Sequence, residues 1–305
     1  MPWCRNNKKM NKTSNNYKRR LTMKRTALIL MSAVVLFAAC NNQPAENDEL
    51  SPLPLKVYKG NYCMELTTGE NVPVIDSNVL DVQNEYNLVW PDMALLGKEV
   101  QKELIMLAFN DGESSTLEEA GKKFLSHTWM EDDDYFQVLK SKRIDSVRVY
   151  PHNYASVKGT VRQDGNLLHF SVNTENNVAF AAHGTYGWNT LIVDRTTEKV
   201  VRLVDMMDTV GLGTVLIRAL NELPVNKENG NTTECLFDEF KQSLPQPDGF
   251  YLDSTRSQLG VYYNIYNAQP YACGMLFVDM PIDWLKNQVT LTAYGKEILG
   301  IKEDK

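Results

Sequence analysis

The chain has 305 residues, of which 43% are hydrophobic, so it can bury a core in one large domain or two smaller ones. Nine of its 32 basic residues and none of its 38 acidic residues precede Cys40, which leaves 23 basic against 38 acidic side chains and a net charge of −15 from Cys40 onward. This charge argues against nucleic-acid binding and favours cationic partners, while solubility alone is the alternative explanation.

The N-terminal region has the pattern of a bacterial export signal. Met23-Lys24-Arg25 supplies a basic start, residues 27–39 are apolar, and Cys40 follows. The apolar run is too short for a membrane-spanning helix, and its junction with Cys40 resembles a lipobox, although Phe37 departs from the commonest form. We therefore predict that residues 1–39 are upstream sequence and a lipoprotein signal peptide.

Lipidation of Cys40 implies a location in the cell envelope, anchored to a membrane by lipid. In a Gram-negative cell this means the outer membrane or the cell surface. Residues 40–54 are polar, acidic and contain proline, which predicts a flexible tether. The acidic stretch after Cys40 also resembles the surface-export signal of some Bacteroidetes lipoproteins.

Residues 55–150 predict an N-terminal α+β companion domain. Alternating β-branched and aromatic residues indicate strands, and Pro91 favours a helix start at residues 90–92. Ser115 or Thr116, followed by Glu118 or Glu119, forms a capping box for a second helix that continues to residues 127–128. The expected strands are residues 56–66, 72–82 and 86–90.

From Arg143 the hydrophobic period changes to two, which is typical of strands. The run Gln163-Asp164-Gly165-Asn166 predicts a hairpin turn, and residues 195–200 predict a six-residue turn. The expected strands are residues 144–150, 154–162, 167–173, 178–182, 188–194, 250–253, 258–265 and 275–280, and the expected helices are residues 204–207, 212–223, 235–244 and 281–285.

Strands that run in groups with hairpin-length links predict an α+β fold, with mostly antiparallel sheet, packed helices and one or two subdomains. If there are two, the second spans residues 151–300. Besides Cys40, the exported part contains Cys63, Cys235 and Cys273, none in a metal-ligand spacing. The sequence leaves two alternatives open: these cysteines form one disulfide and one free thiol, or all three are buried free cysteines.

Two segments carry a resemblance to a known family. One begins Ala182-His183-Gly184 and runs through Asp194 to Met207, and the other is the tyrosine-rich run from Leu259 that ends in Gln269-Pro270-Tyr271-Ala272-Cys273-Gly274. Both resemble the C-terminal extracellular domain of the lysozyme-sensing anti-sigma factor RsiV and of PdaC-type peptidoglycan deacetylases. The resemblance covers residues 146–299, with a weaker companion domain before it.

This resemblance implies a recognition module whose partner is a lysozyme-like enzyme or peptidoglycan. From this sequence we expect neither the transmembrane and sigma-binding segments of the anti-sigma factor nor the catalytic domain of the deacetylase. No cofactor is predicted, because the four histidines are scattered and no metal-ligand, serine-nucleophile or phosphate-loop motif is present. The run Glu131-Asp132-Asp133-Asp134 lacks calcium-loop spacing.

Aromatic residues are the best binding candidates, because tyrosine gives rigid, amphipathic contact surface. Alternation places Tyr262 and Tyr266 on one strand face and Tyr263 on the other, so one set is expected in the core. His183 is open to a catalytic or a structural interpretation, and we favour the structural one. The binding candidates are Tyr262, Tyr266, Pro270, Tyr271, Gly274, His183 and Tyr186.

Two other functions stay open. An envelope glycan hydrolase or deacetylase would need a carboxylate or histidine site, which the sequence does not assemble. A purely structural lipoprotein would need no binding surface at all. A binding module without catalysis is the function that we expect.

Overall fold

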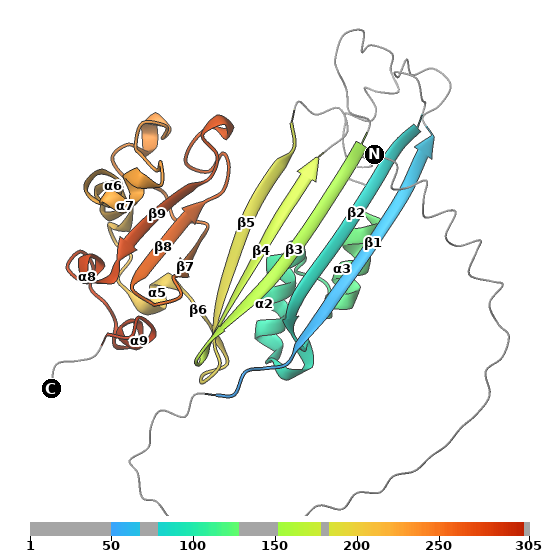
Figure 1. Ribbon diagram of the computed structural model, residues 1–305, viewed down its shortest axis with the longest axis horizontal. Helices are drawn as coiled ribbons and strands as arrows, with labels where there is room; N and C mark the ends of the chain where they lie inside the picture. Colours follow the sequence, from blue (N-terminus) through green and yellow to red (C-terminus); the bar gives the residue numbers. More distant parts are fainter. Residues whose placement is uncertain (1–49, 68–78, 128–151, 178–182, 302–305) are drawn as a thin grey trace, which may run out of the picture. The chain divides into compact units, whose positions relative to one another are not determined.

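The computed structural model describes residues 50–67, 79–127, 152–177 and 183–301. Its larger sheet has six strands in the order β1-β2-β3-β4-β5-β6, shown in Figure 1. Neighbouring strands are antiparallel, apart from the parallel pair β2 and β3. The strands are β1 (Leu55–Thr67), β2 (Val79–Pro91), β3 (His152–Asp164), β4 (Leu167–Asn177), β5 (Thr185–Asp194) and β6 (Lys199–Val201).

Two helices cover one face of this sheet. The helix α3 (Leu117–Ser126) contacts β1 and β2, and α2 (Lys98–Phe109) contacts β3, β5 and β6. Their apolar residues form one core with the inward-facing residues of the strands, among them Trp90, which packs edge-to-face on Phe170. Gly159 is required there, because a Cβ at this position would lie 2.7 Å from Leu88 and 3.0 Å from Trp90.

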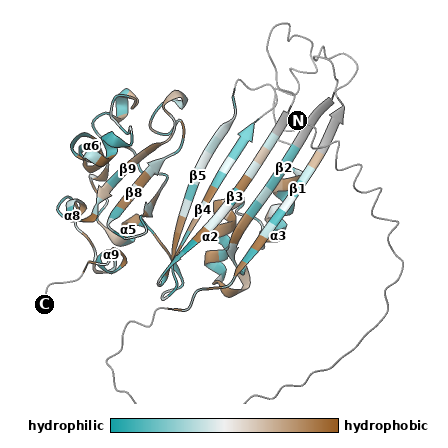
Figure 2. Ribbon diagram, viewed as in Figure 1, coloured by the Kyte–Doolittle hydropathy of each residue, from teal (hydrophilic) through white to brown (hydrophobic). Residues whose placement is uncertain are grey.

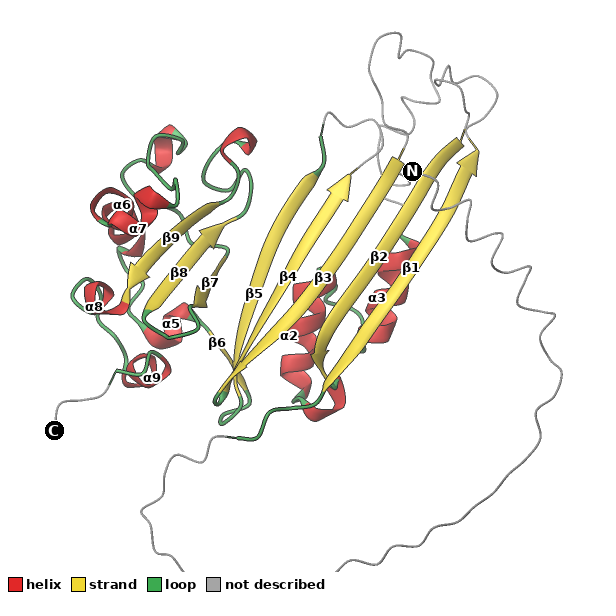
Figure 3. Cartoon of the chain, in the orientation of Figure 1, coloured by secondary structure: helices red, strands yellow, loops and turns green. Residues whose placement is uncertain are grey.

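A second sheet of three antiparallel strands follows, in the order β7-β8-β9. Its core is built from the strands and several short helices, and Figure 2 shows hydrophobic residues along β8 and β9. The strands are β7 (Gly249–Leu252), β8 (Gln258–Tyr263) and β9 (Leu276–Pro281). The helices are α5 (Leu203–Met206), α6 (Leu212–Glu222), α7 (Pro224–Glu228), α8 (Ile282–Leu285) and α9 (Ala293–Ile298), which Figure 3 colours apart from the strands.

The second sheet meets the first at the edge of β5. Since β6 pairs only with residues 192–194, no strand of the described residues pairs with the earlier part of β5 on that side. The Thr190 N–H donates to the Tyr262 hydroxyl at 2.8 Å, and the Trp188 N–H donates to Asn264 Oδ1 at 2.8 Å. Side chains of β8 and the loop after it therefore replace a strand partner at this edge.

The predicted α+β class with mostly antiparallel strands is confirmed. The larger sheet contains strands from both sides of residue 150, and residues 50–305 group as one unit. None of the described helices combines the length and apolarity needed to cross a lipid bilayer.

Several expected element boundaries were wrong. Pro91 ends β2, and the Asp92 carboxylate caps a short 3-10 helix, η2 (Met93–Leu95), so α2 begins only at Lys98. The second helix is capped by Thr116 as expected but ends at Ser126. The Asn84 side-chain amide donates hydrogen bonds to the carbonyls of Phe124 and Leu125 in its last turn, in place of the backbone N–H groups of a further turn.

Two elements of the second half were also mispredicted, and one was missed. Residues 199–201 pair with β5 as β6, so the predicted six-residue turn is shorter. Residues 235–244 contain only the 3-10 helix η3 (Asp238–Phe240), since the Phe237 N–H bonds to the Ala268 carbonyl instead of a helical partner. The helix α9 was not expected. The predictions for residues 72–78, 131–134, 144–150 and 178–182 lie outside the described residues.

Candidate functional site

Four of the predicted binding residues meet at one place on the surface. The His183 ring stacks on Tyr271 with a centroid distance of 3.9 Å, and Tyr266 lies 5.7 Å from Tyr271. Tyr186, at the start of β5, lies 6.0 Å from Tyr271. We call these four residues the aromatic cluster. They come from both segments that carry the family resemblance, so the fold places these two segments side by side.

Hydrogen bonds of His183 fix its place in the aromatic cluster. Its Nδ1 lies 3.0 Å from the Gly184 carbonyl, and its Nε2 lies 3.3 Å from the Tyr266 hydroxyl. Both ring nitrogens therefore lie within hydrogen-bond distance of a partner.

The loop from β8 to β9 carries Tyr266 and Tyr271, and polar contacts hold its first half. The Asn264 N–H and the Asn267 side-chain amide both donate to Asp248 Oδ2, each at 2.6 Å. Asn264 also accepts the Trp188 N–H of β5. The loop is thus tied to the strand that carries Tyr186.

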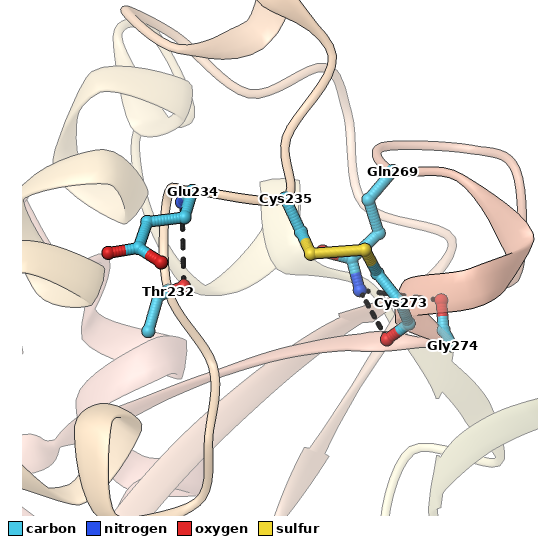
Figure 4. Close-up of a disulfide and its surroundings, with 6 residues drawn as sticks. All are labelled: Thr232, Glu234, Cys235, Gln269, Cys273 and Gly274. Atoms are coloured by element: carbon cyan, nitrogen blue, oxygen red, sulfur yellow. Dashed lines mark hydrogen bonds between the residues drawn. A yellow bond between two sulfur atoms is a disulfide. The ribbon is translucent and has the colours of Figure 1, made fainter.

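A disulfide holds the second half of the loop. Cys273, in the 3-10 helix η4 (Tyr271–Cys273), is bonded to Cys235, as Figure 4 shows. The buried Gln269 side chain donates to the Cys273 carbonyl at 3.1 Å and to the Gly274 carbonyl at 3.4 Å. These links order Tyr271 before any partner arrives. They also show that Cys235 pairs with Cys273, which the sequence left open.

Tyr266 lies outside the strand that was expected to contain it. The strand β8 ends at Tyr263, and Tyr266 has a φ of 70° and is 49% exposed. A bulky aromatic residue in the left-handed region is strained. This backbone conformation places the Tyr266 ring beside Tyr271 and His183 instead of in the core.

Pro270 and Gly274 frame η4. Pro270 is exposed and caps this 3-10 helix, and its carbonyl accepts the Cys273 N–H at 2.9 Å. Gly274 has a φ of 76°, and a Cβ there would lie 3.4 Å from the Tyr186 hydroxyl. The glycine permits the positive φ and the close approach of Tyr186.

Tyr262, the remaining binding candidate, lies in the core. It is 1% exposed and packs against Trp188, with ring centroids 4.7 Å apart. Tyr263 is equally buried, and its hydroxyl donates to the Pro245 carbonyl at 2.7 Å. The expected division of tyrosines between two strand faces does not hold, because β8 is covered on both faces.

Acidic side chains surround the disulfide end of the site. Glu234, Asp238 and Glu239 are exposed on the segment that Cys235 ties to the loop. Lys241 forms an ion pair with Asp238 at 2.7 Å, and within the described residues Glu234 and Glu239 form none. The segment therefore adds negative charge close to the aromatic cluster.

Three cavities among the described residues have no residue of the aromatic cluster in their lining. One of about 550 Å³ lies between β5, β6, α6 and the segment before β7, and none of the seven binding candidates lines it. Within the described residues, no group of three or more His, Cys, Asp or Glu side chains is arranged to hold a metal ion. His183, Tyr186 and Tyr266 are exposed and Tyr271 is half-buried. An exposed aromatic surface suits a macromolecular partner better than a small substrate.

No known family model matches this sequence, and no curated protein matches it. Among solved structures, it is similar to a member of the DUF3298 family from Bacteroides fragilis NCTC 9343, with a TM-score of 0.54 and 18% identity over 82% of this chain and 98% of that chain. A DUF3298 family protein from Pseudomonas aeruginosa PAO1 gives a TM-score of 0.43 and 15% identity over 80% of this chain and 96% of that chain. The first similarity shows a shared fold.

Proposed function

We propose that this protein is a lipid-anchored binding module of the cell envelope that recognises a lysozyme-like enzyme through the aromatic cluster. The observation that carries the proposal is an exposed set of aromatic rings on a loop held by a disulfide and buried polar contacts. Interfaces take most of their binding energy from a few such anchors.

Preorganisation supports the choice of site. A loop that must be ordered on binding loses affinity for each side chain that is immobilised. Here the Asp248 carboxylate, the disulfide and Gln269 already fix the loop. The strained φ of Tyr266 is a further sign, since strain at an exposed ring is retained where the ring has a use.

Charge supports the choice of partner. The part from Cys40 onward has a net charge of −15, and exposed carboxylates lie on the segment joined to the loop by Cys235. A basic lysozyme-like enzyme would be attracted to this surface, and the attraction would mainly raise the association rate and weaken with salt.

The fold and the sequence motifs support the same group of proteins. The fold is that of a DUF3298 protein, and DUF3298 is related to the C-terminal domain of RsiV. The residues that carry the motif resemblance are also those that form the aromatic cluster. Lipidation of Cys40 would keep the module at the envelope, where such enzymes act.

The test is a binding assay with purified Cys40→Ser protein and hen lysozyme at two salt concentrations. We expect saturable binding that weakens at higher salt, and a loss of at least about tenfold in Tyr271→Ala. Leu95→Ala is the matched control, because Leu95 is also an exposed apolar residue but lies in η2.

Insoluble peptidoglycan forms the second arm of the assay. If the protein sediments with peptidoglycan but does not bind lysozyme, the partner is peptidoglycan instead of an enzyme. The aromatic cluster remains the site if Tyr271→Ala again weakens this binding. Absence of binding to both, at low salt, would overturn the proposal.

A further inference from the structure

A second cavity lies on the face of the six-stranded sheet that α2 and α3 do not cover. It has a volume of about 360 Å³ and is closed on one side by β7. Side chains from β3, β4, β5 and β7 line it, and none of them belongs to the aromatic cluster. Those that matter below are Arg162, His169, Ser171, Trp188 and Tyr251.

Two buried polar atoms in this cavity make no hydrogen bond within the described residues. They are Nε of Arg162 and Nε2 of His169, and the two residues are directly opposite each other on β3 and β4. The His169 side chain is only 10% exposed. Buried polar atoms are almost always paired, so two orphaned atoms in one cavity call for an explanation.

Arg162 is held in place by its other end. Its Nη2 donates to the Leu252 carbonyl at 2.9 Å and to the Asp253 carbonyl at 3.3 Å. Both contacts are to neutral groups of β7 and the residue after it. No carboxylate of the described residues forms an ion pair with Arg162, so its positive charge is not neutralised by direct contact.

The two acidic residues beside this pair, Asp164 and Asp253, are already engaged. The Asp253 carboxylate, which lines the cavity, accepts from the hydroxyl groups of Thr255 and Ser257 and from the Gln258 N–H.

Arg256 donates from Nε to Asp164 Oδ2 at 3.0 Å and from Nη2 to the Asp164 carbonyl at 2.8 Å. His169 Nε2 lies 3.7 Å from the same carboxylate oxygen, which is too far for a hydrogen bond. Burial lowers the pKa of His169 to about 4, helped by Arg162 and Arg256 and opposed by Asp164. The imidazole is therefore neutral at pH 7.

Aromatic rings form the opposite wall. Trp188 and Tyr251 have ring centroids 5.3 Å apart, and Tyr251 is fixed because its hydroxyl donates to Asp279 Oδ1 at 2.6 Å. The Ser171 hydroxyl, which shares a hydrogen bond of 3.1 Å with Thr160, adds a polar group on the sheet side. The lining therefore combines the Arg162 guanidinium and the His169 imidazole with flat aromatic rings.

We propose that this cavity binds the carboxylate of a small organic acid, with Arg162 and His169 as its donors and Trp188 and Tyr251 as the wall for its apolar body. A planar guanidinium whose charge is unpaired fits a planar carboxylate. The volume suits a ligand about the size of one sugar or a short acyl amino acid. The inference is independent of the proposed envelope function, since it uses a different surface.

Two carboxylate sources fit this chemistry, and the experiment separates them. The purified full chain, labelled with ¹⁵N-histidine, is titrated with D-glucuronate or with N-acetyl-alanine, at constant ionic strength. The neutral controls are D-glucose and N-acetyl-alanine amide, which keep the body of each ligand but lack the carboxylate. We expect a saturable shift of the His169 imidazole resonance with at least one acid and none with its neutral control.

Variants locate the site. His169→Gln assigns the resonance, and Arg162→Gln is expected to weaken binding by about tenfold or more through the lost charge-assisted hydrogen bond. Because Arg162 also supports β7, Ser171→Leu is the second variant, which fills the cavity and leaves the contacts of Arg162 with β7 in place. Equal shifts with acid and neutral control, no saturable shift with either acid, or undiminished binding by Ser171→Leu would each overturn the proposal.

Discussion

Tyr262 and Tyr266 are close in the chain, but one belongs to the core and the other to the surface. The inner aromatic group consists of the buried Tyr262 and the half-buried Trp188, Tyr251 and Phe277, and its ring contacts are at 4.7 to 6.4 Å. The aromatic cluster has ring contacts at similar distances. Aromatic packing alone therefore does not distinguish a core from a recognition surface.

Hydroxyl partners distinguish the two regions. In the inner aromatic group, the Tyr262 hydroxyl accepts a backbone N–H from β5, and the Tyr251 hydroxyl donates to Asp279. Burial raises the pKa of both tyrosines, helped for Tyr251 by Asp279. In the aromatic cluster, the Tyr266 hydroxyl lies 3.3 Å from Nε2 of another cluster member, His183. Tyr262 and Tyr251 connect elements of the fold, whereas the cluster rings contact one another at the surface.

The largest effect expected from this comparison is on stability. Tyr262→Ala should lower the free energy of unfolding by about 3 to 5 kcal/mol, through the cavity and the unpaired Thr190 N–H. Tyr271→Ala should cost less than about 1 kcal/mol, because its ring is only half-buried. Urea unfolding of both variants measures the difference. Equal losses would show that the aromatic cluster is a second core.

The disulfide gives the next largest effect. It closes a loop with a sequence separation of 38, so the paired change Cys235→Ser with Cys273→Ser should cost about 3 to 4 kcal/mol of unfolding free energy. It should also weaken partner binding by the folded variant, because Tyr271 is close to the lost disulfide. Circular dichroism at the binding temperature checks that the variant is folded. Unchanged binding by a folded variant would contradict the role given to preorganisation.

Asn264 joins the two regions, and its removal should have an intermediate effect. Asn264→Ala leaves the Trp188 N–H without its acceptor and should cost about 1 to 2 kcal/mol of unfolding free energy. Asn287→Ala is the control, since the exposed Asn287 only donates to the Asp283 carbonyl and should change stability by about 0.5 kcal/mol or less. Urea unfolding of the two variants tests whether the edge of β5 depends on this side chain.

Local patterns predicted much of the fold. The hairpin of β3 and β4 was predicted from its alternation and from the turn that contains Gly165, whose φ is 55°. The brief strand β6 and the parallel pairing of β2 with β3 were not predicted, because both depend on contacts between distant segments. Residues 235–244 had a helical pattern, but the disulfide and a bond to Ala268 hold them in another conformation.

The site was predicted in composition but not in geometry. The two motif segments named His183, Tyr186, Tyr266 and Tyr271, and only the fold places them together. Tyr262 was misplaced because alternation assumes one open strand face, whereas the edge of β5 covers that face of β8. Arg162 and His169 were not singled out, although opposite positions beside a predicted hairpin turn place a cation and an imidazole on one face.

The smallest expected effect is the most specific one, because it separates strain from recognition. Tyr266→Gly removes the cost of a positive φ, about 1 kcal/mol, and loses ring contacts that are half exposed to water. Its unfolding free energy should therefore stay within about 0.5 kcal/mol of the wild type or rise, while partner binding falls by about tenfold.

Glu198→Gly is the matched control for strain. Glu198 has a φ of 54° and lies in the turn before β6, so the change should raise stability by up to about 1 kcal/mol and leave binding unaltered. If Tyr266→Gly gains stability and keeps full binding, the strained ring has no role in recognition. The strain would then be a consequence of how the loop closes between Asn264 and the disulfide.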